Sequence, residues 1–452
     1  MPINNLPAAI QSVIQQGYLE REFQTSLRAK LGFRAVAEWM DFPAEIGETI
    51  TKTRPGLLPA ITTPLPPAAN SDITSGITGQ NLNVEQFVLS VNQYAGNMYL
   101  NTVTSRVALG NLFLKYAFTL AEQAARSIDI LAQQTLFQAY VGGNTRVRVT
   151  LGAAATTISV DNIEGFRTTL NSEGQPVPVS SSDPVNVTVG SDVYSLVGFS
   201  ADSTNVSTTP GGISGTLTFS TAVTVADGTA NNPVVSAVAP YIMRPTNSSG
   251  VMANNVTAIS SSDLNNGKLT MQMILTAKAQ LSANGVLPVM DAGGLYVLYV
   301  DPFQATGLYN DPAFQRYQET RTKDMEYRKG VIAEILGVKI VETNINPIQA
   351  SLGAGPIHRG ILCGEGALVE GGFTRTGYEG AEKAGPDDEA ITIVDGIAHI
   401  TREPLDALKQ VVTQSWSYIG GFVVPTDTTT DPSTIPTATN AAHKRAMIIE
   451  SL

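Results

Sequence analysis

The 452-residue sequence contains one cysteine and few charged residues. With only Cys363 present, no disulfide can form within the chain. Charged residues make up 15% of the chain against 43% hydrophobic residues, so the polar surface must consist largely of uncharged Ser, Thr, Asn and Gln. Such surfaces suit large buried interfaces, because charged groups are costly to remove from water.

Basic residues are scarce. The chain has 28 Lys and Arg against 39 Asp and Glu, a formal net charge of -11, and a pI near 4.9. Gripping DNA through its phosphates needs clustered Lys and Arg, so this composition argues against direct nucleic-acid binding. No run approaches the roughly 20 apolar residues of a membrane span. No cleavable leader opens the sequence either, so we expect synthesis in the cytosol and no membrane anchor.

The motifs of catalysis and metal binding are also missing. There is no HExxH, CxxC or P-loop pattern, and the three histidines occur in unrelated contexts: His358, His399 and His443. Cys363 lies in an apolar, strand-like run and is expected to be a small buried residue rather than a nucleophile. The adjacent acids at 387–389 point in different directions and predict a solvated turn instead of a cation site. We therefore expect no catalytic, cofactor-binding or metal-binding residues.

The first element present is an amphipathic segment at the N-terminus. Its apolar residues lie four apart and precede a charged run at 20–22: Leu6, Ile10, Ile14 and Tyr18. This spacing predicts a helix with one apolar face. That face needs a partner, which is either the body of its own domain or, if the segment is an arm, a neighbouring subunit.

A proline-rich stretch follows at 46–80, rich also in Thr, Ser and Gly. Neither a helix nor a central strand tolerates its five prolines: Pro55, Pro59, Pro64, Pro66 and Pro67. The alternating residues Val84, Phe87, Leu89 and Val91 then predict an extended strand that returns to the body. Long connections without a core of their own are usually functional or disordered, so this one is a candidate intersubunit loop.

The strongest periodicity in the sequence lies at 105–141. Apolar residues recur every three or four positions without a proline, which predicts one helix of roughly 50 Å at 1.5 Å per residue. Gly142 and Gly143 supply its stop signal.

Composition changes at residue 144. Short alternating runs rich in Val and Thr, separated by turn residues, continue to about residue 240 and predict an inserted all-β domain; they occupy 147–151, 185–189, 215–219 and 223–226. Arg146, Arg148 and Arg167 are the only basic residues between 144 and 240.

Mixed α/β character resumes after the insertion. We predict a helix at 269–283, followed by strands at 295–300, 337–342, 360–363 and 390–394 that form one mixed sheet flanked by helices. Asp301 and Pro302 are expected to end the first of these strands. The run at 445–450 predicts a last strand that docks on the body.

Three stretches carry a family resemblance. They are the return strand at 84–94 leading into the helix from Ser105, the strands at 295–302 and 337–344 with Pro347, and the segment 404–416. Together with the order of elements, they resemble the major capsid proteins of tailed bacteriophages, which have the Johnson fold.

The resemblance implies an α+β Johnson fold with an inserted all-β domain. Its parts would be an N-terminal arm (1–45), an extended loop and return strand (46–104), the spine helix of a peripheral domain (105–143), the insertion (144–243), a mainly axial domain (244–403) and a C-terminal return to the peripheral domain (404–452).

The function it implies is that of a shell subunit. The chain would self-assemble as hexamers and pentamers into the icosahedral head shell of a virion, put together in the host cytoplasm and enclosing DNA without binding it specifically. A separate scaffolding protein and a portal are expected partners, with room for a decoration protein. The intersubunit contact residues would lie in the extended loop: Lys52, Arg54, Pro64, Pro66 and Pro67. Lys52, the only lysine of that loop, would be the one donor for a Lys–Asn crosslink of the kind found in some members.

Two alternatives stay open. The first is an encapsulin-like bacterial nanocompartment shell, which shares the fold and would be indicated by a cargo enzyme encoded alongside. The second is a β-rich tail or adhesin protein, which explains 144–240 but leaves the long helix unexplained. An enzyme explains no specific feature.

Overall fold

The computed structural model describes residues 32–41, 49–55, 61–62, 84–101, 112–171, 175–319, 334–372, 389–394, 396–402, 411–427 and 441–452. The amphipathic segment at 6–22 and the acids at 387–388 lie outside these ranges, and so does the expected helix start at Ser105. The chain divides into two compact units. One comprises 1–50, 88–133 and 368–423, and the other comprises 51–87, 134–367 and 424–452.

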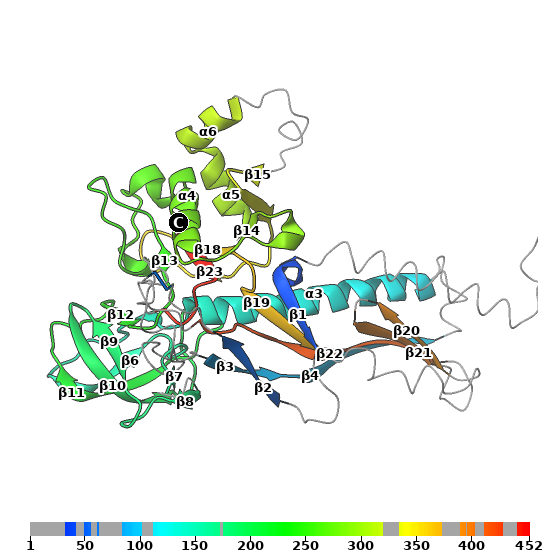
Figure 1. The fold of residues 1–452 in the computed structure, drawn as a ribbon, viewed down its shortest axis with the longest axis horizontal. Coiled ribbons are helices and arrows are strands. Elements are labelled where there is room, and N and C mark those ends of the chain that lie inside the picture. The colour runs from blue at the N-terminus through cyan, green and yellow to red at the C-terminus, as the bar shows by residue number, and fades with distance from the viewer. Residues whose placement is uncertain are drawn as a thin grey trace, which may run out of the picture. The chain divides into compact units, whose positions relative to one another are not determined.

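The long helix is confirmed as α3, Leu112–Val141, which at 30 residues is about 45 Å long (Figure 1). Its buried face in the first unit is made of Leu120, Ala121, Ala124, Ala125 and Ile128. Alanines at this spacing let a helix approach a sheet closely while still burying apolar surface. The helix ends as predicted, with Gly143 in the left-handed region at φ 77°.

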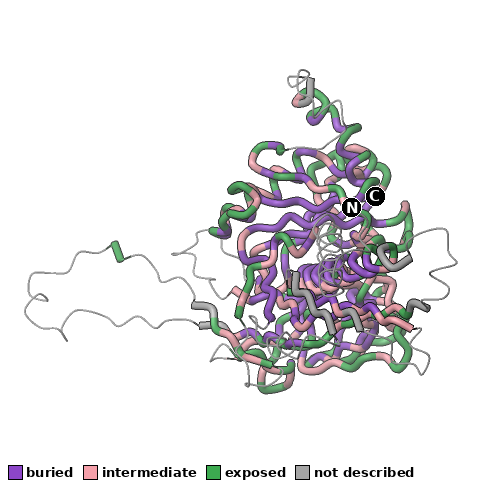
Figure 2. The backbone as a smooth tube through the Cα atoms, turned by 90° about the vertical axis from the view of Figure 1, so that its right-hand side faces the viewer, coloured by how far each residue is buried: buried purple, intermediate pink, exposed green. Residues whose placement is uncertain are grey.

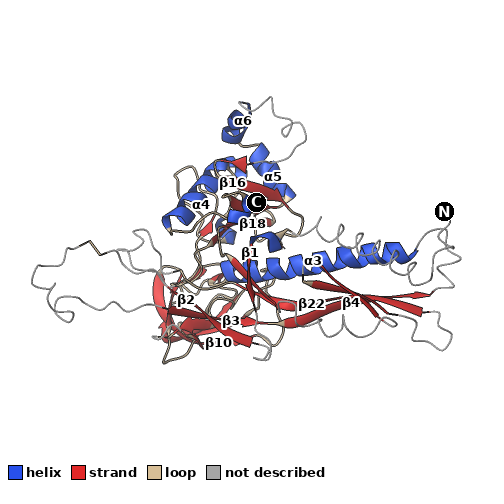
Figure 3. Cartoon of the chain, turned by 45° about the vertical axis from the view of Figure 1, so that its right-hand side comes forward, coloured by secondary structure: helices blue, strands red, loops and turns tan. Residues whose placement is uncertain are grey.

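A six-stranded sheet packs against this face of α3 (Figure 3). Its strands run in the order β1 (Ala37–Asp41), β19 (Leu368–Gly372), β22 (Val411–Val423), β21 (Ile397–Arg402) and β20 (Glu389–Val394), while β4 (Asn92–Asn101) pairs with β22. Trp416 and Tyr418 of β22 are buried against the helix, and the Trp416 ring nitrogen donates to Gln123 Oε1 at 3.2 Å.

The root of the N-terminal segment is fixed to the same unit. A 3-10 turn at Phe33–Val36 precedes β1, and the Oδ1 atom of Asp129 on α3 accepts the backbone N–H groups of Gly32, Phe33 and Arg34. Burial raises the pKa of Asp129, although these three hydrogen bonds act to lower it. Arg34 also pairs with buried Glu370 of β19 at 2.7 Å.

The region 144–236 forms a closed β-barrel. Its strands run in the order β5 (Asn144–Arg146), β12 (Pro233–Ser236), β9 (Val185–Val189), β10 (Asp192–Ala201), β11 (Gly215–Val223) and β6 (Ala155–Val160). The chain just after β5 pairs back onto β6, because Arg148 N donates to Ser159 O at 2.8 Å and Val147 bridges Val160. Closure removes the open edges, and the inward-facing residues build a core of their own. A small ribbon, β7 (Thr168–Leu170) with β8 (Pro176–Pro178), lies outside the barrel sheet.

A second, mixed sheet of seven strands belongs to the same unit as the barrel. Its order is β13 (Ile242–Met243), β23 (Ala446–Ser451), β18 (Ile357–Cys363), β14 (Tyr296–Val300), β16 (Val338–Glu342) and β15 (Glu334–Ile335), with β17 (Ile348–Gln349) on β18. The strands β14, β18 and β23 are buried at every position, and most of their residues are apolar. Figure 2 colours the backbone by burial, with buried residues in purple. Helices α4 (Met271–Ala283), α5 (Pro302–Tyr309) and α6 (Pro312–Glu319) contribute to its core. Short 3-10 turns occur at 256–258, 264–267 and 290–292.

Four sequence predictions need correction. The strand at 390–394 is β20 and lies in the sheet under α3, not in the mixed sheet. The segment 404–452 is divided, because β22 joins the sheet under α3 and β23 joins the mixed sheet. The run at 147–151 forms only one isolated bridge, and the run at 223–226 leaves its strand after Val223. Asp301 and Pro302 end β14 as predicted, and they also begin α5, since Asp301 caps the helix and proline suits its first turn.

A glycine contact joins the end of α3 to the barrel and gives a test of this packing. Gly165 has φ 81°, and a Cβ placed on it would lie 2.1 Å from the backbone nitrogen of Gly143. We expect Gly165→Ala to lower the free energy of unfolding by at least about 2 kcal/mol, because backbone must move to make room. Gly152→Ala is the matched control, since nothing lies within 4 Å of its Cβ position. Equal denaturation midpoints for the two variants would contradict this packing.

Candidate functional site

The structure places the predicted intersubunit residues on a two-stranded ribbon. Strand β2 (Thr49–Pro55) pairs only with β3 (Val84–Ser90) among the described strands. Lys52 and Arg54 both lie in β2, and Lys52 is partly buried. Pro64, Pro66 and Pro67 lie outside the described residues.

The ribbon is held by buried apolar residues, among them Phe87 of β3. Leu89 and Val91 are buried, and Ile50 packs against their cluster together with Ile419 and Val423 of β22. Thr51 and Thr53 are exposed. An isolated two-stranded hairpin is at best marginally stable in water, so further contacts would stabilise the ribbon.

The histidines and the cysteine do not converge on a reaction centre. Cys363 is fully buried in β18, and burial raises the pKa of its thiol far above the usual range. His358 pairs with Asp301, whose other oxygen caps α5. Burial lowers the pKa of His399 to about 4 and also lowers that of His443 to about 4. Within the described residues, no group of three or more His, Cys, Asp or Glu could hold a metal ion.

A buried polar arrangement crosses three neighbouring strands of the mixed sheet, β23, β18 and β17, and includes Arg244, which directly follows β13. Glu450 of β23 accepts from Arg244 at 2.7 Å on one side and from Arg359 of β18 at 2.9 Å on the other. Arg359 also donates to Gln349 of β17. Burial acts to raise the pKa of Glu450, but the two guanidinium groups outweigh it and hold the pKa below its ordinary value.

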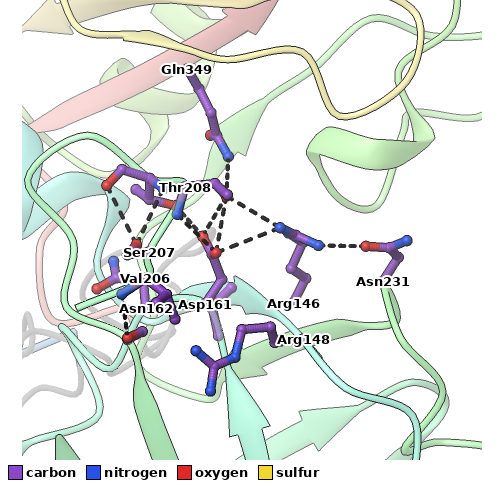
Figure 4. A network of polar contacts seen from close by, with 12 residues as sticks. Arg146, Arg148, Asp161, Asn162, Val206, Ser207, Thr208, Asn231 and Gln349 are labelled. Carbon is purple, nitrogen blue, oxygen red and sulfur yellow. Dashed lines mark hydrogen bonds and ion pairs between the residues drawn. The ribbon is translucent and has the colours of Figure 1, made fainter. Parts of the chain in front are cut away.

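This row continues into the barrel (Figure 4). Gln349 Nε2 donates to the hydroxyl of Thr208 at 3.2 Å, and that hydroxyl lies 2.9 Å from both carboxylate oxygens of Asp161. Arg146 of β5 then lies 3.5 Å from Asp161 and donates to Asn231 at 2.5 Å. We call the set from Arg244 to Asn231 the polar junction, because it ties the barrel to the mixed sheet inside one compact unit.

A cavity of about 30 Å³ lies in the polar junction. Its lining includes Arg146, Asp161, Arg244, Arg359 and Glu450. A space of this size accommodates one or two water molecules. Ionised groups here lose their bulk hydration, so removing one partner leaves the other charge without compensation.

Sequence reasoning missed the polar junction. In the sequence, Arg146 was notable only as one of three basic residues in the region 144–240. Glu450 was only the last residue of the strand predicted at 445–450. The chain brings these two residues together from positions about 300 apart. Local residue spacing does not show that Arg146 and Glu450 line the same cavity.

None of the described helices is both long enough and apolar enough to cross a membrane. Sequence comparison finds no family model and no curated protein that matches this chain. Structure comparison does find similar folds. The capsid of Ralstonia phage GP4 is 12% identical with a TM-score of 0.50, covering 94% of this chain and 90% of the other. The chain has the fold of a phage capsid protein.

Two other solved capsids resemble this chain less well in space. The capsid of cyanophage P-SCSP1u is 13% identical with a TM-score of 0.44, covering 93% of this chain and 87% of the other. That of cyanophage Pam1 is 11% identical with a TM-score of 0.45, covering 95% and 92%. The capsid fold seen in the GP4 comparison confirms the α+β class expected from the sequence.

The polar junction makes a prediction about stability. Glu450→Gln removes the charge that two buried arginines share, and we expect a loss of about 3–5 kcal/mol in the free energy of unfolding. Glu164→Gln is the control, because its partner Arg167 is 46% exposed and such pairs contribute less than about 1 kcal/mol. Chemical denaturation of both variants measures the difference. Similar losses would show that the junction is not energetically special.

The buried histidine His443 makes a second prediction. Its pKa is about 4 in the folded chain and about 6.5 when unfolded, so the unfolded state takes up a proton first as the pH falls. Its contribution to stability is therefore complete above pH 6.5 and declines by about 3 kcal/mol by pH 4. We expect His443→Gln to lose this part of the pH dependence. The prediction is contradicted if the free energy of unfolding falls equally for the unchanged protein and for His443→Gln between pH 6.5 and 4.

Proposed function

We propose that the chain is the major capsid protein of a tailed phage, which self-assembles into the icosahedral head shell that encloses the genome. The observation that carries this proposal is the capsid fold, which extends over 94% of the chain. In this reading α3 is the spine helix, the ribbon β2–β3 is the base of the extended loop, the mixed sheet is the axial domain and the barrel is the insertion.

Charge and composition support the same function. At -11 the chain repels DNA, so a shell of it encloses a genome without gripping it. The function is structural, with no reaction to catalyse. We further propose hexamers and pentamers as the assembly units, with a separate scaffolding protein, a portal and a decoration protein as partners in the virion.

The test is assembly itself. The chain, expressed with and without the proposed scaffolding protein, should sediment as large closed particles in analytical ultracentrifugation. A strictly monomeric species under every salt and scaffold condition would contradict the proposal. Particles that contain a protein cargo instead of a genome would identify the chain as a nanocompartment shell.

The ribbon is proposed to contact an adjacent subunit through Lys52 and Arg54, with Pro64, Pro66 and Pro67 stiffening the loop beyond them. Prolines reduce the entropy lost when an extended segment is ordered. In a protein of net charge -11, two cations at the ribbon are suited to pair with carboxylates of a neighbour.

Charge reversal tests this contact. We expect Lys52→Glu with Arg54→Glu to abolish particle formation while leaving the thermal unfolding midpoint of the monomer unchanged. The control is Arg316→Glu with Lys339→Glu, which makes the same charge change at exposed positions outside the ribbon and should still assemble. Normal particles from the ribbon variant, or an unfolded monomer, would show that the ribbon belongs to its own subunit's core.

A further inference from the structure

Strand β4 leaves one of its edges open. All ten of its residues pair with β22, in register from Asn92 opposite Gly420 to Asn101 opposite Val411. Among the described strands it has no other partner. Because alternate residues of an antiparallel strand direct both N–H and C=O to the same side, about five residues of β4 present these groups outward.

Several other open edges in the described part of the chain have features that disfavour the addition of a further strand. Long edges are usually blunted by charge or proline. Strand β1 has Glu38 and Asp41, β20 begins with Glu389, and β2 carries Lys52 and Arg54. The edge strands β13, β15 and β17 of the mixed sheet are only two residues long.

Strand β4 has none of these devices. Its sequence, NQYAGNMYLN, contains no proline and no charged residue. Tyr94 and Met98 pack toward the core under α3, which fixes the register and turns Ala95, Asn97 and Tyr99 outward. Tyr99 is 68% exposed, and Asn97 Nδ2 donates to its hydroxyl at 3.2 Å.

We propose that β4 is a self-pairing edge, joined in antiparallel fashion to β4 of a second copy of the chain about a twofold axis at Asn97. The inference rests on the proposed function, since it supplies one of the contacts between copies. An open antiparallel edge is complementary to its own copy, because each outward N–H and C=O meets the same pair rotated by 180°.

Charge favours the second copy as the occupant. Two chains of net charge -11 repel each other, and β4 lets their backbones meet along nine residues, Gln93 to Asn101, without placing like charges opposite one another. With the axis at Asn97, its amide faces the same amide of the second copy. Tyr99 then lies opposite Ala95 of that copy, so a large side chain meets a small one.

Cysteine crosslinking of the full chain tests the pairing. The only native cysteine, Cys363, is fully buried and gives no background. Under mild oxidation, Asn97→Cys should form a disulfide-linked dimer at least tenfold more abundantly than Val193→Cys. The control residue is also exposed, at 64%, but lies in β10, which already pairs with β9 and β11. Equal dimer yields would overturn the proposal.

Charge substitution provides a second, independent readout. Asn97→Lys alone and Asn97→Asp alone each place like charges on the axis and should weaken self-association about fivefold, whereas an equal mixture of the two should restore it. Failure of the mixture to exceed either variant would overturn self-pairing. Shells that form from the Asn97→Cys chain without crosslinked dimers refute the edge alone, whereas crosslinked dimers from chain that never forms shells refute the proposed function alone.

Discussion

The structure depends on one uninterrupted helix. Helix α3 contributes 112–133 to one compact unit and 134–141 to the other. Its small buried residues, such as Ala121 and Ala124, allow β22 to approach closely enough for Trp416 and Tyr418 to pack against the helix. At the C-terminal end of α3, Tyr140 donates to the carbonyl of Ala367. Gly142 and Gly143 then connect the helix to β5, the first strand of the barrel.

The barrel is joined to the mixed sheet by polar contacts. Its own core is complete within 147–234, and its sheet closes on itself, so it has no open edge to offer. The attachment is instead polar: a chain of hydrogen bonds from Asp161 to Glu450 through Thr208, Gln349 and Arg359. Buried ionic groups of this kind add orientation more than stability, because their partners must be present in a defined geometry.

Much of this fold could be read from the sequence. The helix α3, the strands β9, β14, β16 and β18 and the burial of Cys363 follow from periodicity and composition alone, because each is decided by local apolar spacing. Pairing is not local: nothing in 390–394 distinguishes a strand of the sheet under α3 from one of the mixed sheet. The polar junction was missed for the same reason, since Arg146 and Glu450 meet only through the tertiary fold. The expected contact residues Lys52 and Arg54 lie together on the ribbon, and their partner across the contact stays a prediction.

The central proposal is that many copies of this chain assemble into a closed shell. Electron cryo-microscopy of particles formed by the full-length chain tests that claim most directly. We expect closed icosahedral particles. Their repeating density should contain a rod of about 45 Å, the length of α3, and a closed barrel. Open fibres, or particles whose repeating unit lacks this helix, would contradict it.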